Sequence, residues 1–335
     1  MYHDASLSGG RPAGVTLHAI LDHGRAVLDV ESHALTLLSA MLDEDFARAV
    51  ELILAANGRV IVSGMGKSGH IARKMAATFA STGTPAIFIH PAEAAHGDLG
   101  MLLAGDMLVA LSNSGATPEL RPIVHHARRL GCPIVGITSQ PHSPLTQMSN
   151  VSLILPTARE ACPVNISPTT STTMMLALGD ALAVAAMSVR GISREALELL
   201  HPGGVIGSRL LPVNEIMHAG AQLPLVAVDL PMRDVLVTMT EKSLGIAGVV
   251  DTEGRLVGTI TDGDLRRNID RLLMSSAGEV MTLYPKTIAD GTYAEDARAI
   301  MSSNKITSLF VMSHDDPEKP IGLIHIHDFN RLGMS

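Results

Sequence analysis

The hydrophobic and polar positions of the chain change their pattern twice. Between residues 15 and 57, apolar side chains recur at helical spacing and end at Asn57-Gly58, which predicts helices before a core domain. From Arg59 onward, short apolar runs rich in Val, Ile and Leu alternate with amphipathic segments. This alternation predicts a doubly wound α/β fold, in which helices cover a parallel sheet, closed by a long helix from about Thr170 to Arg190. Ligands of such folds bind at the carboxyl ends of the strands.

A different sequence follows Gly203-Gly204, and it occurs twice. Its matching residues stand 62 or 64 positions apart: Glu215 and Glu279, Met217 and Met281, Asp234 and Asp296, Met239 and Met301, Gly258 and Gly322, Asp264 and Asp328. Two copies indicate a paired module, because a solenoid needs three or more repeats. We therefore expect a flexible tail over 1–14, a sheet domain over 15–210 that includes its N-terminal helices and an HPGG linker, and small α/β modules over 211–274 and 275–335.

Charge and hydropathy narrow the classes of partner. The net charge of −8 argues against nucleic acid, because binding to a phosphate backbone requires a basic surface. The stretch from Met174 to Val189 is apolar, but Asp180 interrupts it and it is too short to cross a bilayer. The N-terminus does not resemble a secretion signal, and the two cysteines lack metal-binding or redox spacing. We expect a cytoplasmic protein that binds neither nucleic acid nor membrane.

The segment VSGMGKSGHIARK, residues 62–74, joins the first predicted strand to a helix. Its glycines let the backbone approach a ligand, and the new helix presents N–H groups that lack partners, so an anion fits there. The spacing is not that of a Walker A loop, which disfavours a nucleoside triphosphate. It matches G-x-G-x-x-G, but His90-Pro91 stands where a dinucleotide fold would place an acid for the ribose. A nicotinamide is therefore not favoured, and we expect no cofactor.

A second loop of similar design, LSNSGATPE at residues 111–119, follows the third predicted strand. Thr117 suits a helix N-cap, and Pro118 suits the first helical position. Two such loops at the ends of nearby strands could enclose one phosphate. The expected phosphate ligands are Gly66, Ser68, Ser112, Ser114 and Thr117. The alternative is that serine and glycine only form tight turns. It is less favoured because both loops combine serine and glycine between a strand and a helix.

These motifs resemble two known domain families. G-x-G-K-S in the first loop and S-N-S-G-x-T-x-E in the second resemble the sugar isomerase (SIS) domain, which binds phosphosugars, and the repeat resembles a tandem pair of cystathionine-β-synthase (CBS) domains. Their order, joined by HPGG, is similar to that of the arabinose 5-phosphate isomerase family. The resemblance extends through HPAEAAHGDLGML, EACP, STTMMLALGDALAVA and TDGDLRR. It implies a homotetrameric aldose-ketose isomerase that interconverts D-ribulose 5-phosphate and D-arabinose 5-phosphate through an enediol and supplies the precursor of Kdo.

The resemblance also implies four active-site residues: Lys67, His96, Glu119 and His201. Glu119 is the candidate base, and Lys67 would bind the phosphate or stabilise the oxyanion. The two histidines would transfer protons during ring opening or isomerisation, with His201 supplied by a neighbouring subunit. The sequence shows no set of His, Cys, Asp and Glu with metal-ligand spacing, so we expect no metal.

In the CBS family adenine nucleotides bind between the modules, and the first copy carries a G-x-x-T-x-x-D pattern whose Thr261 and Asp264 would bind a ribose. The second copy has His325 in place of the threonine, which argues against symmetric nucleotide binding. Binding of a nucleotide or nucleotide-sugar and a purely dimerising role both remain open. Three alternatives to the assigned isomerase also remain: a hexosamine phosphate isomerase, a noncatalytic binding module, and a phosphosugar-sensing transcription regulator. The regulator would need a DNA-binding domain and a basic surface.

Overall fold

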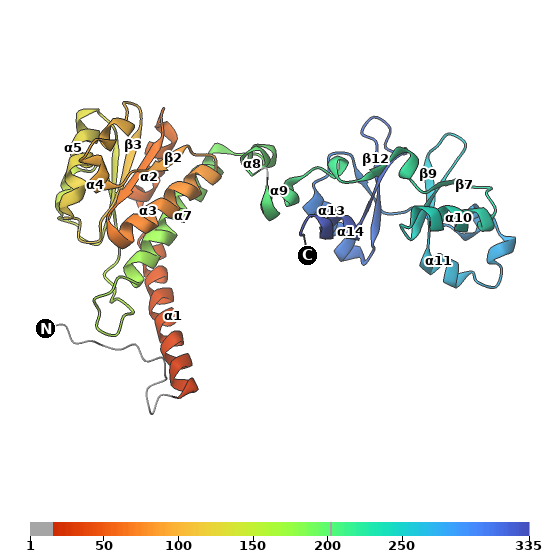
Figure 1. The fold of residues 1–335 in the computed structure, drawn as a ribbon, viewed down its shortest axis with the longest axis horizontal. Coiled ribbons are helices and arrows are strands. Elements are labelled where there is room, and N and C mark those ends of the chain that lie inside the picture. The colour runs from red at the N-terminus through yellow and green to blue at the C-terminus, as the bar shows by residue number, and fades with distance from the viewer. Residues whose placement is uncertain (1–15, 202, 335) are drawn as a thin grey trace. The chain divides into compact units, whose positions relative to one another are not determined.

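The computed structural model describes residues 16–201 and 203–334, so the expected tail over 1–14 lies outside the described residues. The chain forms two compact units that divide between Ser193 and Arg194 (Figure 1). The first unit begins with the helices that the sequence predicts, α1 (Leu17–Ala40) and α2 (Glu44–Ala55). Each begins at a side-chain cap, because Thr16 accepts the N–H of Ala19 and Asp43 accepts the N–H of Asp45.

A five-stranded sheet in the order β2-β1-β3-β4-β5 forms the centre of the first unit. Its strands are β1 (Val60–Gly64), β2 (Ala86–Phe88), β3 (Met107–Leu111), β4 (Ile134–Thr138) and β5 (Val151–Ile154). Its further helices are α3 (Gly66–Ser81), α4 (Pro91–Ala94), α5 (Arg121–Arg129), α6 (Pro144–Met148) and α7 (Thr170–Arg190), with short 3-10 helices η1 (Asp98–Met101) and η2 (Pro118–Leu120). All neighbouring strands are parallel. The doubly wound α/β fold is therefore confirmed, and α7 has the predicted bounds.

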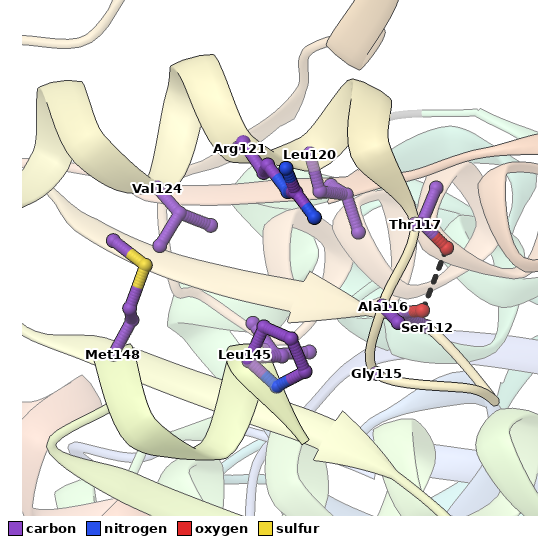
Figure 2. Close-up of a pocket in the computed structure, with 10 residues that line it drawn as sticks. Ser112, Gly115, Ala116, Thr117, Leu120, Arg121, Val124, Leu145 and Met148 are labelled. Atoms are coloured by element: carbon purple, nitrogen blue, oxygen red, sulfur yellow. Dashed lines mark hydrogen bonds between the residues drawn. The ribbon is translucent and has the colours of Figure 1, made fainter.

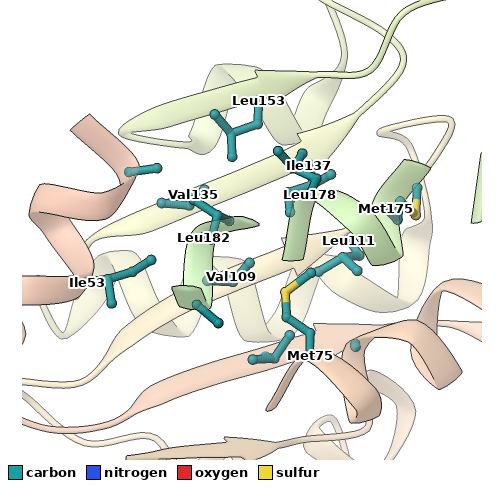
Figure 3. Close-up of a cluster of buried hydrophobic side chains, with 14 of the residues drawn as sticks. Ile53, Met75, Val109, Leu111, Val135, Ile137, Leu153, Met175, Leu178 and Leu182 are labelled. Atoms are coloured by element: carbon teal, nitrogen blue, oxygen red, sulfur yellow. The ribbon is translucent and has the colours of Figure 1, made fainter. Parts of the chain in front are cut away.

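Helices on both faces of this sheet enclose two hydrophobic cores. On one face, side chains of α2, α3 and α7 pack on β3, β4 and β5, and the side chains labelled in Figure 3 lie within this cluster. On the other face, α5 and α6 cover a separate cluster. Among the described residues, only α7 is long and apolar enough to span a membrane, with a mean hydropathy of 1.6. Met174, Leu178 and Leu182 of this helix are buried in the first core.

The second unit contains two four-stranded sheets, one for each repeat. The first, in the order β10-β9-β8-β7, consists of β7 (Leu225–Ala227), β8 (Ile246–Val250), β9 (Leu256–Thr261) and β10 (Thr282–Leu283). The second, in the order β11-β12-β13-β6, consists of β6 (His218–Ala219), β11 (Thr287–Ala289), β12 (Ser308–Met312) and β13 (Pro320–His325). The helices are α8 (Arg194–Leu200), α9 (Gly204–Leu210), α10 (Met232–Lys242), α11 (Asp262–Arg267), α12 (Ala277–Val280), α13 (Ala294–Asn304) and α14 (Ile326–Arg331), with 3-10 helices η3 (Val213–Glu215), η4 (Gly220–Gln222) and η5 (Leu272–Met274).

The modules exchange their short edge strands across the boundary that the repeat predicts. Strand β6 precedes the first sheet in sequence but pairs with β13 of the second, where His218 lies opposite Leu323. Conversely, β10 lies beyond the expected boundary at residue 274 but pairs with β9, where Thr282 lies opposite Thr259. Each sheet is thus completed by a strand from outside its own copy of the repeat.

The first unit ends at Ser193, before the expected domain end at residue 210. Helix α8 belongs instead with the second unit. Arg194 forms an ion pair with Asp296 at 2.6 Å, and the hydroxyl of Tyr293 donates to Glu195 at 2.6 Å. These polar contacts attach α8 to the first turn of α13.

Candidate active site

The two phosphate loops begin side by side at the carboxyl edge of the first sheet. Strands β1 and β3 are neighbours, and their register places Gly64 opposite Leu111. The loop before α3 therefore starts next to the loop that begins at Ser112. The structure brings together the two segments that the sequence selects, residues 62–74 and 111–119, although residues 75–110 separate them along the chain.

Glycines let α3 begin directly on the end of β1. A Cβ atom on Gly69 would lie 2.5 Å from the carbonyl oxygen of Gly64, and one on Gly64 would lie 2.9 Å from the carbonyl oxygen of Ser68. Gly66 has a φ of +57°, which side chains rarely adopt. The N-cap residue Met65 makes no side-chain cap, so the first N–H groups of α3 remain open to an anion.

Lys67 and Ser68 lie in the first turn of α3. Lys67 is exposed, and it forms no ion pair with any residue that the structure describes. Ser68 is half-buried beside it. A cation and a hydroxyl thus accompany the N–H groups at this helix end, which is a suitable set for a phosphate.

Hydroxyl groups converge in the second loop. The Oγ atom of Ser112 lies 2.7 Å from Oγ1 of Thr117 and 3.5 Å from Oγ of Ser114, as Figure 2 shows for the first pair. Ser112 is buried, whereas Ser114 is exposed. Gly115 has a φ of +62° and packs against Ser143, so a side chain does not fit there. The loop is therefore held in a shape that clusters three hydroxyls at the sheet edge.

A small apolar crevice lies beside this loop, between α5 and α6 (Figure 2). Leu120, Val124, Leu145 and Met148 line it, and its volume is about 20 Å³. The space is too small and too apolar for a sugar phosphate. A substrate would instead lie over the open edge where the two loops meet.

The other candidate catalytic residues lie in different surroundings. Glu119, the last residue of the second loop, is exposed in η2. His96 is exposed in the turn that follows α4, and its backbone N–H donates to Glu93. His201 lies in the second unit, where its Nδ1 is 2.9 Å from the carbonyl oxygen of Leu197. Within the first unit, the structure therefore places Lys67, His96 and Glu119 after strands of one sheet.

Sequence reasoning did not single out Glu160, which follows β5. Its carboxylate accepts the N–H of Thr169 at 2.7 Å and that of Ser171 at 3.2 Å, as well as both hydroxyls. Burial raises the pKa of Glu160, but these hydrogen bonds outweigh it, so its pKa is lowered from the ordinary value. The protein's own carboxylate thus occupies the start of α7, which leaves the loops after β1 and β3 for a substrate phosphate.

Sequence reasoning also did not single out His90, which lies at the carboxyl edge of the same sheet. His90 follows β2, and its Nδ1 atom is buried without a hydrogen-bond partner among the described residues. Its ring packs edge-on against Phe88, at 6.2 Å between centroids. The only sequence signal was its place after a strand.

The predicted ribose-binding pair of the second unit lies at a cleft of about 1050 Å³. Asp264 is buried, and its carboxylate accepts hydrogen bonds from Thr261 and Thr282. It also forms an ion pair with Arg267. A ribose would have to displace one of these donors. Across the described part of the chain, no group of three or more His, Cys, Asp or Glu residues is arranged to hold a metal ion.

Comparison with known proteins agrees with this architecture. The SIS domain model matches residues 53–185, and the CBS domain model matches residues 213–271 and 277–334. Arabinose 5-phosphate isomerase KdsD of Pseudomonas aeruginosa is 45% identical over 311 residues, which cover 92% of this chain and 95% of the relative. The enzyme of the same name from Escherichia coli K12 is 43% identical over 315 residues, covering 93% and 95%.

A solved structure is also similar to the first unit. A protein of E. coli CFT073 in complex with A5P has a TM-score of 0.55 and 34% identity, and the match covers 56% of this chain and all of that one. The KdsD relatives extend the similarity over both units. The chain therefore belongs to the arabinose 5-phosphate isomerase family, with a SIS domain followed by a pair of CBS domains.

Proposed function

We propose that this protein interconverts D-ribulose 5-phosphate and D-arabinose 5-phosphate. The observation that carries the proposal is the pair of glycine-serine loops, which start side by side where Gly64 lies opposite Leu111. The N–H groups of α3 and the hydroxyls of Ser68, Ser112, Ser114 and Thr117 would hold the phosphate. The relatives named as arabinose 5-phosphate isomerases support this choice among sugar phosphates.

The phosphate serves as the handle that fixes the reacting carbons, since orienting a substrate removes much of the entropic barrier. Glu119 would take the proton from C1 of the ketose, and the electron pair would form the C1–C2 double bond of an enediolate. Lys67 would stabilise the developing negative oxygen. Return of the proton to C2, with transfer of a hydroxyl proton from O1 to O2, gives the aldose.

The two histidines would carry the proton transfers between oxygens. His96 follows α4 at the same sheet edge, which suits a group that opens the furanose ring of arabinose 5-phosphate. His201 belongs to the second unit. The family resemblance supports its role at the active site, and we assign it as a contribution from a neighbouring subunit. A proton-transfer group of this kind typically contributes about 10²- to 10⁴-fold in rate.

The test offers the purified full chain a panel of aldose and ketose phosphates in deuterium oxide. Proton NMR should show ribulose 5-phosphate formed from arabinose 5-phosphate, with deuterium at C1, and no turnover of arabinose without its phosphate. Turnover of hexosamine phosphates alone would reject the assigned substrate. Phosphosugar binding without turnover would reject catalysis and favour a noncatalytic binding module.

We further propose a cytoplasmic homotetramer that supplies the precursor of Kdo. Apolar residues on α1, including Leu17, Leu21 and Leu28, are exposed, while its buried residues Ala34 and Leu38 lie in its C-terminal half. A second chain covering this face would bury it. Light scattering of the purified protein should give four chain masses, and a monomeric mass would contradict the assembly.

The cleft between the CBS modules would bind a nucleotide or nucleotide-sugar. Cationic side chains of Arg266, Lys286 and Lys305 line it, and Asp264 is already neutralised by Arg267. Ser308 adds a buried hydroxyl without a partner among the described residues. Calorimetric titration of the full chain with adenine and cytidine nucleotides tests this assignment, and absence of binding to every nucleotide would overturn it.

A further inference from the structure

The two CBS modules place matched residues at matched points, but with different chemistry. In the first module, Thr261 precedes α11 and Thr282 lies on the edge strand β10. The residues 64 positions away in the second module are His325, which precedes α14, and His218 on the edge strand β6. Two hydroxyls in one module are thus replaced by two imidazoles in the other.

In the first module, the hydrogen bonds around Asp264 join groups whose charge stays constant near neutral pH. Asp264 accepts the N–H of Thr261 at 2.8 Å and its hydroxyl at 2.6 Å, and it accepts the hydroxyl of Thr282 at 2.7 Å. A threonine hydroxyl neither gains nor loses a proton in this range. The start of α11 is therefore insensitive to pH.

In the second module, the corresponding hydrogen bonds around Asp328 and the start of α14 depend on a neutral imidazole. The N–H of His325 donates to Asp328 at 2.7 Å, and the N–H of His327 donates to Nδ1 of His325 at 3.2 Å. The ring of His218 reaches the same carboxylate, at 3.2 Å from Nε2. Nδ1 can accept a hydrogen bond only while it carries no proton, so the ring must be the neutral Nε2–H tautomer.

The titratable and charged groups around His325 come from three elements. The ring of His327 on α14 lies 4.8 Å away between centroids, and Arg331 of the same helix lies 3.8 Å from Asp328. His218 approaches from β6. His325 and His327 line the cleft, as does Lys305. A proton on His325 would therefore be added next to other cationic groups on one wall of the cleft.

We propose that the second CBS module makes ligand binding in the cleft depend on pH. Protonation of His325 breaks its hydrogen bond to the N–H of His327, loosens the start of α14 and makes this wall more positive. Anionic ligands then bind the cleft more tightly at acid pH. The inference rests on the proposed use of the cleft as a ligand site, and it adds the regulation of that site.

The electrostatics of the ring set the range in which the switch works. Burial lowers the pKa of His325 below its ordinary value of 6.5, the charges of His327 and His218 lower it further, and Asp328 opposes them. Because the folded pKa is depressed, the unfolded ring binds its proton first as the pH falls. The contribution of His325 to the stability of this module is fully present above about pH 6.5 and is lost as the pH falls through the folded pKa.

Hydrogen–deuterium exchange of the full chain tests the first step. As the pH falls from 7.5 through the lowered pKa of His325, peptides over α14 should lose about fivefold in protection, after correction for intrinsic exchange, which is the loss of one helix N-cap. Peptides over α11 provide a matched control within the molecule, because Thr261 caps that helix, and their protection should stay constant. His325→Thr should make α14 behave like α11, and His325→Asn gives a second capping residue without the titration.

Sulfate tests the second step, because it carries two charges throughout this pH range. It should protect peptides over Lys305–Phe310 more strongly at the acid end of the titration than at pH 7.5 in the wild type, and this difference should be smaller in His325→Thr, which keeps His327 in the cleft. Parallel loss of protection in α11 and α14, or a sulfate effect that does not grow on acidification, would overturn the proposal. Isomerase turnover of the wild type at pH 7.5 is scored separately, so failure of the catalytic assignment is distinguishable.

Discussion

Gly69→Ala perturbs the contact that sets the first phosphate loop. The added Cβ would lie 2.5 Å from the carbonyl oxygen of Gly64 and 3.2 Å from its carbonyl carbon, whereas ordinary contacts begin at 3.4 Å. Both neighbours are backbone atoms at the end of β1, so neither can rotate away. The start of α3 must move by roughly an ångström, and misplacement of that size costs about 100-fold in rate at an oriented site.

The stability change should be much smaller than the change in activity. Overpacking of a tight contact costs about 1–3 kcal/mol, but alanine is better than glycine in a helix by about 1 kcal/mol. We therefore expect a loss of about 1 kcal/mol in unfolding free energy alongside a 100-fold loss of kcat/KM. Urea unfolding followed by circular dichroism measures the first quantity, and conversion of arabinose 5-phosphate measures the second.

Gly179→Ala is the matched control for this prediction. Gly179 lies within α7, in the same unit, and a Cβ there would lie 2.4 Å from Cε of Met75, which is the flexible end of a side chain. Met75 can move aside, so the substitution should change the free energy of unfolding by at most about as much as Gly69→Ala and leave kcat/KM unchanged. If Gly69→Ala also keeps wild-type kcat/KM, the close approach of α3 to β1 does not position the substrate and the reasoning is refuted.

Three further predictions address separate groups. Glu119→Gln should abolish exchange of the substrate's α-proton while arabinose 5-phosphate still binds in calorimetry; retained exchange would remove Glu119 as the base. Glu160→Gln should lower kcat/KM and increase proteolysis of the loop over 156–169, because a neutral amide is a weaker acceptor for Thr169 and Ser171; an intact loop would contradict this. Burial raises the pKa of Asp106, but the N–H groups of Arg59 and Leu103 and the charge of Arg59 lower it overall. Asp106→Asn weakens these hydrogen bonds to a charged group, so it should lower the free energy of unfolding by about 2 kcal/mol near pH 7 and leave kcat unchanged. The difference from wild type should persist above about pH 4 and vanish as the pH falls through the lowered pKa, and a difference that does not depend on pH would refute it.

The sequence could predict the elements because local patterns determine them. Buried apolar runs identified the strands of the first sheet, and the glycine at the end of α7, Gly191 with a φ of +64°, marks where that helix stops. The repeat offsets identified two similar modules. Both signals need only neighbouring residues or a simple comparison of the chain with itself.

Spatial order was harder to predict because it depends on contacts between distant residues. The adjacency of the two loops follows from the strand order β2-β1-β3-β4-β5, which no local pattern encodes. The exchange of β6 and β10 between modules has the same cause, since a strand of two residues carries almost no pattern. Glu160 was missed because the groups that bind it, Thr169 and Ser171, come from the helix after a long loop.

The central claim is that the loops after β1 and β3 grip the phosphate of the sugar. A crystal structure of the full-length Glu119→Gln variant with arabinose 5-phosphate tests it most directly, since the variant should bind without turnover. We predict the phosphorus atom between the first turn of α3 and the hydroxyls of Ser112, Ser114 and Thr117. A phosphate bound away from both loops would contradict the account.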